Sequence, residues 1–560
     1  FKQKTAYEIM PSLVGSEMCI RDRSKGGIKM TLKRTILKSP FKEIVSLALI
    51  YEFPRKFLFN IIENRLHKIL LERDIAHFPR KMQEDKFYMV RSMLRAIDNG
   101  LKKGWISRQV WSPFLKSFGS VYLKENNKIE TFQEQYGFKP PGFITISPTK
   151  LCNLHCAGCY ANSFRSAKEK LDYNIISRVI KEQKELWGSH FTVISGGEPL
   201  LYKNEGKTIF DLAKEHRDTF FLMYTNGTLI NDQIARKFAE VGNITPAISV
   251  EGFEKETDER RGNGVHKKIL KAFENLRKYG VPFGISVTAT RFNAELIMSD
   301  EFIDYYFNHH GALYGWIFQY MPIGRSFTLD LMVTPEQRLQ MYLKTWKLIR
   351  EKGIFLADFW NCGTVSTGCI SAGRYGGYFY IDWNGNVMPC VFNPYKIHNI
   401  IEVYKQGGDL NTVLFSSFFK GIRDWQKKYA LEKPSSEMGN IIIPCPIRDH
   451  YKMMYELIKK TGAKPADEAA EQALQDPEYY KGLVKYGEEL KKITDKIWEK
   501  EYLEPERKRI QEINKVPQTL DFLNIQGNIN HLRQALDCLL YTSDAADEGL
   551  GVDLGGRRII

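Results

Sequence analysis

Between residues 143 and 352, short apolar runs alternate with longer amphipathic segments, and this alternation restricts the chain to few folds. The predicted strands are 143–147, 191–195, 220–225, 246–250, 283–290 and 316–321. The predicted helices lie near 172–187, 206–216, 232–241, 266–279, 300–309 and 335–352. Strands that alternate with helices predict a parallel sheet with helices packed outside it. Such a sheet carries its chemistry in the loops at the carboxyl ends of its strands.

Composition divides the rest of the chain around this repeating part. The two ends resemble translated sequencing-adapter read-through, so they are left out of the fold prediction and Met30 is the expected start. The expected divisions are 1–29 (adapter-like), 30–138 (basic, amphipathic and helical), 139–353 (strands and helices), 354–455 (glycine-, aromatic- and cysteine-rich, with a β-hairpin at Asn384-Gly385), 456–537 (charged and helical) and 538–560 (adapter-like). The expected class is α/β: a partial (β/α)6 TIM-like barrel with a helical N-terminal region and a small cysteine-rich C-terminal extension.

Much of the net charge of +15 lies near the N-terminus, where residues 33 to 130 hold 20 Lys and Arg against 10 Asp and Glu. A basic region attracts anionic lipid, nucleic acid or acidic substrates, although a solvated basic face is an equally good interpretation. No segment has the roughly 20 consecutive apolar residues that span a membrane. The most apolar run, Ile44 to Tyr51, is long enough only to lie in a membrane surface.

Three cysteines follow the first predicted strand: Cys152, Cys156 and Cys159, with C-x3-C-x2-C spacing. Clustered thiolates suit zinc, copper or iron–sulfur clusters. A zinc site completed by His155 or a distant residue is one alternative, but zinc sites usually pair their cysteines as C-x2-C twice or with histidines. A [4Fe–4S] cluster usually takes four cysteines. With three, one iron would stay open for a small molecule.

A second motif, "VISGGEPLL", ends the second predicted strand. Gly196 and Gly197 would let a ligand approach the backbone closely. Glu198 offers a carboxylate to a ligand ammonium group, and Pro199 fixes the turn. Alone, this motif could be only a tight turn. One strand–helix unit after the cysteine loop, it predicts a binding site shared by the two loops.

Together these residues resemble the radical S-adenosylmethionine (radical SAM) superfamily over residues 140 to 350. The resemblance implies that Cys152, Cys156 and Cys159 hold a [4Fe–4S] cluster whose open iron binds S-adenosylmethionine, with catalytic residues beyond it unknown. The other cofactor-binding positions that it implies are Tyr160, Gly196, Gly197, Glu198, Pro199, Thr225, Asn226, Ser249 and Arg261, and "QYMPIGR" (319–325) would close the pocket floor. Glu251 matches less well, because the family often has Asp there. A turn or packing role is an open alternative for the positions that follow Pro199.

The remaining four cysteines outside the tails are Cys362, Cys369, Cys390 and Cys445. The C-x15-G-x4-C spacing from Cys369 to Cys390 resembles the SPASM extension of many radical SAM enzymes. The resemblance implies one closed auxiliary [4Fe–4S] cluster for electron transfer or structural support, with a structural zinc as the alternative. No cysteines remain for a further cluster, so we expect two clusters rather than three.

The resemblance implies reductive cleavage of S-adenosylmethionine to a 5′-deoxyadenosyl radical, which abstracts hydrogen from a substrate carbon. SPASM-type relatives mostly modify peptides or proteins, so peptide or protein modification or cofactor maturation is the first hypothesis. A lipid or isoprenoid is the second, because the basic amphipathic N-terminal helices could lie at a membrane; they could equally cover the barrel. A non-catalytic iron–sulfur or zinc protein is the third.

The expected partners follow from these hypotheses. An electron donor such as flavodoxin or ferredoxin would reduce the cluster, and no nucleic acid is expected. The expected location is the cytoplasm, with peripheral contact at the inner membrane face left open. Asp382, in the predicted hairpin, could serve as a base, but an aspartate there more often caps a turn.

Overall fold

The computed structural model describes residues 52–72, 77–107, 110–111, 113–114, 117 and 126–515. Both adapter-like tails and the apolar run from Ile44 to Tyr51 lie outside these residues. The chain divides into two compact units, the first ending at Glu504 and the second beginning at Pro505. Of the second unit, the structure describes only part of one helix, α22 (Glu504–Lys515).

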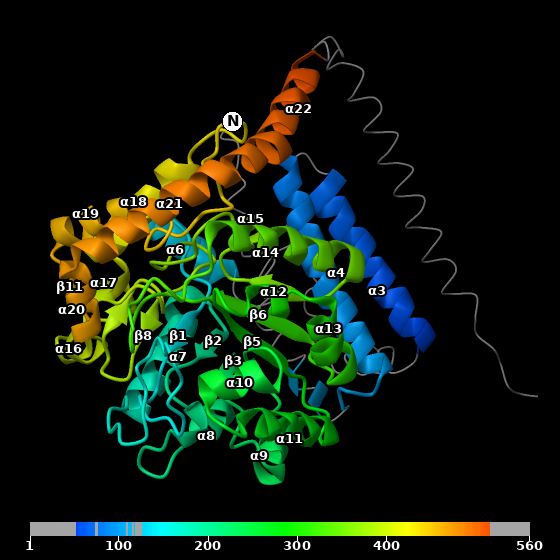
Figure 1. Ribbon diagram of the computed structural model, residues 1–560, viewed down its shortest axis with the longest axis vertical. Helices are drawn as coiled ribbons and strands as arrows, with labels where there is room; N and C mark the ends of the chain where they lie inside the picture. The colour runs from blue at the N-terminus through cyan, green and yellow to red at the C-terminus, as the bar shows by residue number, and fades with distance from the viewer. Residues whose placement is uncertain are drawn as a thin grey trace, which may run out of the picture. The chain divides into compact units, whose positions relative to one another are not determined.

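The first unit is built on a nine-stranded sheet with the order β7-β6-β5-β4-β3-β2-β1-β8-β9 (Figure 1). Its strands are β1 (Ile144–Ile146), β2 (Phe191–Ile194), β3 (Phe220–Thr225), β4 (Ile244–Val250), β5 (Gly284–Ala289), β6 (Tyr314–Gln319), β7 (Leu356–Asp358), β8 (Tyr380–Ile381) and β9 (Val387–Met388). Neighbours from β1 to β7 pair in parallel, and β8 pairs in parallel with β1. The six predicted strands and the α/β class are therefore confirmed, and β7 is a seventh strand that was not predicted.

Helices connect consecutive strands and lie around the outside of the sheet (Figure 1). They are α7 (Tyr173–Trp187), α8 (Ile209–Glu215), α9 (Asp232–Val241), α10 (Glu254–Arg261), α11 (Val265–Lys278), α12 (Ala294–Ile297), α13 (Asp300–Ile303), α14 (Pro335–Lys347), the 3-10 turn η3 (Pro199–Leu201) and the π-helical turns η4 (Asp304–His309) and η5 (Leu348–Lys352). Local chemistry sets their ends. Asp172 accepts hydrogen bonds from the N–H groups of Asn174 and Ile175 at the start of α7, and Gly188 ends that helix in the left-handed conformation.

The N-terminal helices are α3 (Glu52–His67), continued by η2 (Lys68–Glu72), then α4 (Arg80–Lys102) and α6 (Asn126–Tyr136). Helix α4 packs into a hydrophobic cluster with residues from distant parts of the chain, including Met82, Trp346, Cys362 and Trp498. Its buried Asp85 pairs with Arg350 and accepts a 2.7 Å hydrogen bond from the hydroxyl of Tyr502. Helix α4 is therefore packed into the core of the first unit. This packing agrees with the alternative, left open by the sequence, that the N-terminal helices cover the barrel.

The cysteine-rich part begins with α15 (Gly363–Ser366) and the antiparallel hairpin β8–β9, which confirms the predicted turn at Asn384-Gly385. One carboxylate oxygen of Asp382 accepts hydrogen bonds from the N–H groups of Asn384 and Asn386, both at 2.9 Å. These contacts agree with the interpretation of Asp382 as a residue that caps the turn. The remaining elements are β10 (Tyr395–Lys396), α16 (Ile400–Lys405), α17 (Leu410–Leu414), α18 (Ser417–Gln426), η6 (Lys427–Leu431), α19 (Tyr451–Thr461), β11 (Lys464–Pro465), α20 (Glu468–Gln475), α21 (Pro477–Trp498) and η7 (Glu499–Leu503).

Two features bear on the site. The main hydrophobic cluster runs without a break from the strands of the sheet into the cysteine-rich part, so the two share one core. Within the ranges that the structure describes, no helix combines the length and the apolar character needed to cross a bilayer.

Candidate functional site

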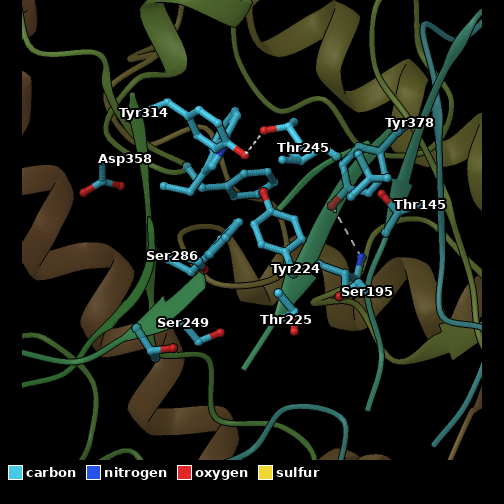
Figure 2. Close-up of a pocket in the computed structure, with 18 of the residues that line it drawn as sticks. Thr145, Ser195, Tyr224, Thr225, Thr245, Ser249, Ser286, Tyr314, Asp358 and Tyr378 are labelled. Atoms are coloured by element: carbon cyan, nitrogen blue, oxygen red, sulfur yellow. Dashed lines mark hydrogen bonds between the residues drawn. The ribbon is translucent and has the colours of Figure 1, made fainter. Parts of the chain in front are cut away.

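A cavity of about 500 Å³ lies inside the curved sheet and is lined by residues of β1 to β7 and of the loops that follow them. Figure 2 shows polar residues of its wall, with Tyr224 reaching into its centre. Many of the predicted site residues line this cavity: Cys152, Cys156, Cys159, Tyr160, Gly196, Gly197, Thr225, Asn226, Ser249, Arg261 and, from the second cysteine set, Cys362. Five other predicted residues do not line it: Glu198, Pro199, Cys369, Cys390 and Cys445.

The three cysteines that follow β1 are close enough to influence one another's ionisation. Burial raises the pKa of Cys152 to about 12, and the nearby Glu198, Cys156 and Cys159 add to the rise. A bound metal reverses this preference, because its positive charge favours the thiolate. The amide of Asn226 is 3.8 Å from the Cys152 sulfur.

In the described part of the chain, no three His, Cys, Asp or Glu side chains are arranged to hold one metal ion. A [4Fe–4S] cluster does not require that arrangement, because each of its cysteines binds a different iron. Three thiols on one wall of a cavity fit such a cluster.

The glycines of the GGEP motif are required by the cysteine loop itself. The N–H of Gly197 donates to the carbonyl of Thr149 at 2.9 Å, and that of Glu198 donates to Leu151 at 2.8 Å. A Cβ atom on Gly197 would lie 2.3 Å from the Leu151 oxygen, and Gly196 has a φ of +112°. The sequence predicted close approach by a ligand; the structure adds close approach by the neighbouring backbone.

Glu198 is fully buried and joins the GGEP loop to the end of β3. One carboxylate oxygen accepts hydrogen bonds from the Thr225 hydroxyl (2.7 Å) and the Leu200 N–H (3.1 Å), and the other accepts from the Asn226 N–H (2.8 Å). Burial raises its pKa, and these hydrogen bonds act in the opposite direction. Asn226 in turn donates to the side-chain oxygen of Asn153 in the cysteine loop at 2.9 Å.

Arg261 connects the end of β4 with the cysteine loop. Its Nε donates to Glu251 at 2.8 Å, and its guanidinium is 3.9 Å from the Cys156 sulfur. Burial opposes the charge of Arg261, but Glu251 and Cys156 outweigh that effect and raise its pKa. Arg260, which the sequence did not single out, also donates to Glu251. Two fixed cations thus lie beside the cysteine trio, where an anionic group would be favoured.

Arg325 is the last residue of the "QYMPIGR" motif, and it was not itself predicted as a site residue. Its guanidinium donates to the carbonyls of Cys156 and Ser163, and its N–H donates to the carbonyl of Cys159 at 3.0 Å. The motif therefore holds the cysteine loop from outside the sheet, while its first residues, Gln319 and Tyr320, line the cavity.

Tyr160, the residue that follows the third cysteine of the trio, points toward β2. Its hydroxyl is 2.5 Å from the Ser195 hydroxyl and accepts a 3.2 Å hydrogen bond from the Gly196 N–H. Burial raises its pKa. The ring is therefore held in one orientation on the cavity wall.

The second cysteine set falls into two neighbourhoods. Burial raises the pKa of Cys390, and Cys369 and Cys445 add to the rise, so these three lie together. Burial also raises the pKa of Cys362, but the charges that add to it are those of Asp358 and Asp85. Cys362 begins α15 on the cavity wall.

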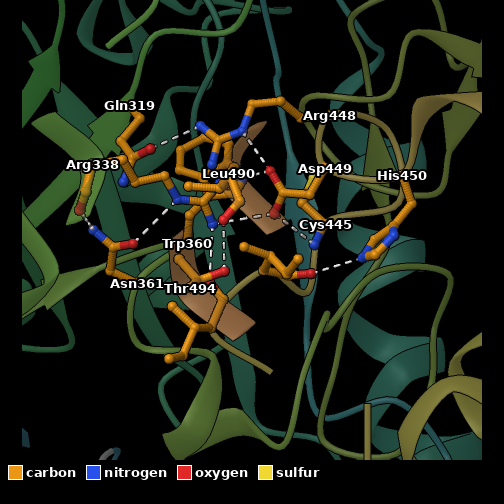
Figure 3. Close-up of polar contacts among 12 residues, drawn as sticks. Gln319, Arg338, Trp360, Asn361, Cys445, Arg448, Asp449, His450, Leu490 and Thr494 are labelled. Atoms are coloured by element: carbon orange, nitrogen blue, oxygen red, sulfur yellow. Dashed lines mark hydrogen bonds and ion pairs between the residues drawn. The ribbon is translucent and has the colours of Figure 1, made fainter. Parts of the chain in front are cut away.

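A buried polar network connects Cys445 with the cavity (Figure 3). Arg338 pairs with Asp449 at 2.6 Å, and the other Asp449 oxygen accepts a 3.1 Å hydrogen bond from the Cys445 N–H. Arg448 donates to the same carboxylate at 3.1 Å and to the Gln319 side chain at 2.9 Å. Although burial opposes the charge of Asp449, Arg338 and Arg448 hold its pKa below the ordinary value. This network was not predicted, because Arg338 and Gln319 are separated from Arg448 and Asp449 by more than a hundred positions.

Residues 146–297 match the sequence profile of the radical SAM superfamily. These residues form a radical SAM domain. The match agrees with the predicted resemblance to this superfamily and supports an enzyme, whose substrate the match does not name.

Curated relatives are similar over part of their length. An uncharacterized protein of Methanocaldococcus jannaschii is 33% identical over 176 residues, 29% of this chain and 57% of that protein. The Fe-coproporphyrin III synthase of Methanosarcina barkeri is 26% identical over 175 residues, 31% of this chain and 43% of that protein. The chain thus spans about half the length of these two. The mycofactocin maturase MftC of Mycobacterium ulcerans is 26% identical over 277 residues, 48% of this chain and 72% of that protein.

Among solved structures, Streptococcus suis SuiB bound to S-adenosylmethionine is 17% identical, with a TM-score of 0.44 over 65% of this chain and 87% of that chain.

Proposed function

We propose that the chain is a radical SAM enzyme that abstracts a hydrogen atom from a substrate carbon in the cavity. The observation that carries the proposal is the position of Cys152, Cys156 and Cys159 on the wall of a cavity inside a radical SAM domain. These three residues would hold a [4Fe–4S] cluster with one open iron. When bound, the reduced cluster supplies the electron that cleaves S-adenosylmethionine to methionine and a 5′-deoxyadenosyl radical.

The side chains around the cysteines would bind and orient the cofactor. Tyr160, fixed against Ser195, offers a flat face to the adenine, and Ser249 lies on the same cavity wall. Arg260 and Arg261 place positive charge where a carboxylate would lie. Glu198 would support binding through the loops, because its oxygens are already occupied by Thr225, Leu200 and Asn226. The largely enclosing sheet would keep water from the reacting carbon.

For the second cysteine set we propose a closed auxiliary [4Fe–4S] cluster, with structural zinc as the alternative. The shared neighbourhood of Cys369, Cys390 and Cys445 supports a common site. Cys362 is the fourth proposed ligand, and its different neighbours make it the one to test first. Electron transfer and structural support are both compatible with the buried network at Asp449.

The substrate class is also a proposal. The similar proteins include an Fe-coproporphyrin III synthase and a mycofactocin maturase, which favours cofactor maturation or peptide modification. A flavodoxin or ferredoxin is the proposed electron donor, and the cytoplasm is the proposed location. A lipid is a second candidate, favoured by the composition of the cavity wall.

The deciding experiment is anaerobic reconstitution of the full chain, followed by an iron count and an assay for 5′-deoxyadenosine after reductant and S-adenosylmethionine are added. We expect about eight irons per chain from two four-iron clusters. We also expect 5′-deoxyadenosine, which Cys156→Ala should abolish. About four irons with retained cleavage would remove the auxiliary cluster from the proposal. Zinc in place of iron, with no cleavage, would contradict the proposal as a whole.

A further inference from the structure

The cavity wall has little charge to offer a substrate. Among the described residues that line it, four side chains other than cysteine and tyrosine are ionisable: Arg260, Arg261, Asp358 and Arg374. All four are engaged within the protein. Both arginines of α10 bind Glu251, Asp358 accepts two hydrogen bonds from Gln319 at 3.0 and 3.1 Å, and Arg374 donates to backbone carbonyls.

Several of the hydroxyl groups on this wall are also paired within the protein. Thr245 donates to the carbonyl of Pro282 at 2.9 Å and lies 2.8 Å from the hydroxyl of Tyr314, a contact that Figure 2 shows. Tyr160 pairs with Ser195 at the cysteine end. A peptide placed here would bury amide groups that these paired hydroxyls do not satisfy, and an unpaired buried amide is costly.

Away from the cysteines, most of the exposed wall is apolar, and hydroxyl groups such as those of Tyr224, Thr245 and Ser286 interrupt it. Strand residues contribute Val193, Leu222, Phe318 and Ala357, and Phe355 adds to them just before β7. One face of α4 closes the cavity with residues from successive turns: Met89, Val90, Met93, Ala96 and Ile97. The cavity is therefore a mainly apolar chamber that begins at the cysteine trio and extends to α4.

We propose that this chamber binds a long hydrocarbon chain of a lipid, with the reacting carbon near Cys152, Cys156 and Cys159 and the rest of the chain against α4. The inference rests on the proposed radical SAM function and specifies its substrate class. An alkyl or prenyl chain needs no hydrogen-bond partner, so its transfer into this chamber is favourable where that of a peptide is not.

Binding is tested on the reconstituted full chain with S-adenosylmethionine present. The probe is cis-parinaric acid, whose fluorescence rises in an apolar site. We expect saturable binding, and we expect hexadecanoic acid to displace the probe at least tenfold better than octanoic acid. The absence of saturable binding, or equal displacement by the two acids, would overturn the inference. This comparison uses the wild-type protein and so does not depend on how any variant folds.

A variant locates the site. Ala96→Trp fills the chamber at α4, far along the chain from the cysteine loop, and should weaken probe binding at least tenfold. Asn99→Trp is the matched control, because Asn99 is exposed on the same helix and does not line the cavity. Unchanged binding by Ala96→Trp would overturn the inference.

Iron content and the formation of 5′-deoxyadenosine are measured alongside. Asn99→Trp should match the wild type in both, and Ala96→Trp should match it in iron content, which shows that the variant is folded and loaded. Probe binding without any cleavage of S-adenosylmethionine would contradict the proposed function and leave the hydrocarbon site in place. Cleavage with no probe binding would contradict only the hydrocarbon site.

Discussion

Replacing Asp449 with asparagine tests whether the buried network in Figure 3 fixes the cysteine-rich part. Asp449 is fully buried, and its partners Arg338 and Arg448 are 1% and 0% exposed. The variant leaves two buried guanidinium groups without a carboxylate. Breaking a buried ion pair from one side typically costs about 3–5 kcal/mol. We expect Asp449→Asn to lose stability in that range, because no solvent can replace the lost partner.

The assay is denaturant unfolding of the reconstituted full chain under anaerobic conditions, followed by circular dichroism. Asp232→Asn is the matched control, since Asp232 pairs with Lys278 at the surface, where both side chains are more than half exposed. Exposed pairs contribute about 0–1 kcal/mol. If Asp449→Asn lowers the free energy of unfolding no more than the control does, the network does not stabilise the cysteine-rich part, and the reasoning is refuted.

The same carboxylate predicts a pH dependence. Its pKa in the folded protein is below the ordinary value of about 3.9, so the stabilisation is complete above that value and is lost as the pH falls through the folded pKa. The acid sensitivity of the wild type should therefore decrease in Asp449→Asn. Because the Asp449 carboxylate also accepts from the Cys445 N–H, the variant should lose iron from the second cysteine set and keep the iron of the trio.

Three further predictions concern the loops and the surface. Gly197→Ala places a methyl group against the Leu151 carbonyl and should lower iron at the trio by at least half, whereas Gly206→Ala, with a positive φ but open space, should not. Arg325→Met removes the donor to the Cys156 and Ser163 carbonyls and should speed the loss of iron during gel filtration, with the fold unchanged by circular dichroism. The full chain should float with anionic vesicles at low salt and be released at high salt; salt-independent behaviour would argue against the basic N-terminal region as a lipid-binding surface.

The strands were predictable from the sequence because their apolar runs are nearly continuous, as expected for parallel strands buried on both faces. The exceptions have physical causes. β7 has only three residues and ends in Asp358, whose charge hides the pattern while Gln319 and Asn361 satisfy it in the structure. Helix α10 reads "EKETDERR" and has no apolar face, so its single buried residue, Thr257, gives no periodic signal.

The candidate site also has a part that was predictable from the sequence and a part that was not. The cysteine and GGEP motifs were predictable because each is local, with a fixed spacing. The contacts that hold them are not local: Arg325 reaches Cys156 across 169 positions, and Asn226 reaches Asn153 across 73. A sequence identifies which residues could bind a cluster, but it does not identify which distant side chains keep their loop in place.

Helix α4 bears on two questions that the sequence left open: the role of the N-terminal region and the nature of the substrate. Its buried Asp85 pairs with Arg350 and accepts from Tyr502, which fixes the helix to the first unit. Two to three turns further along the helix, Met93 and Ala96 form the end of the chamber. A helix held in this way cannot leave the chamber without breaking an ion pair whose carboxylate is fully buried. The end wall is therefore rigid, and the length of chain that the chamber accepts should be set by the side chains at these two positions.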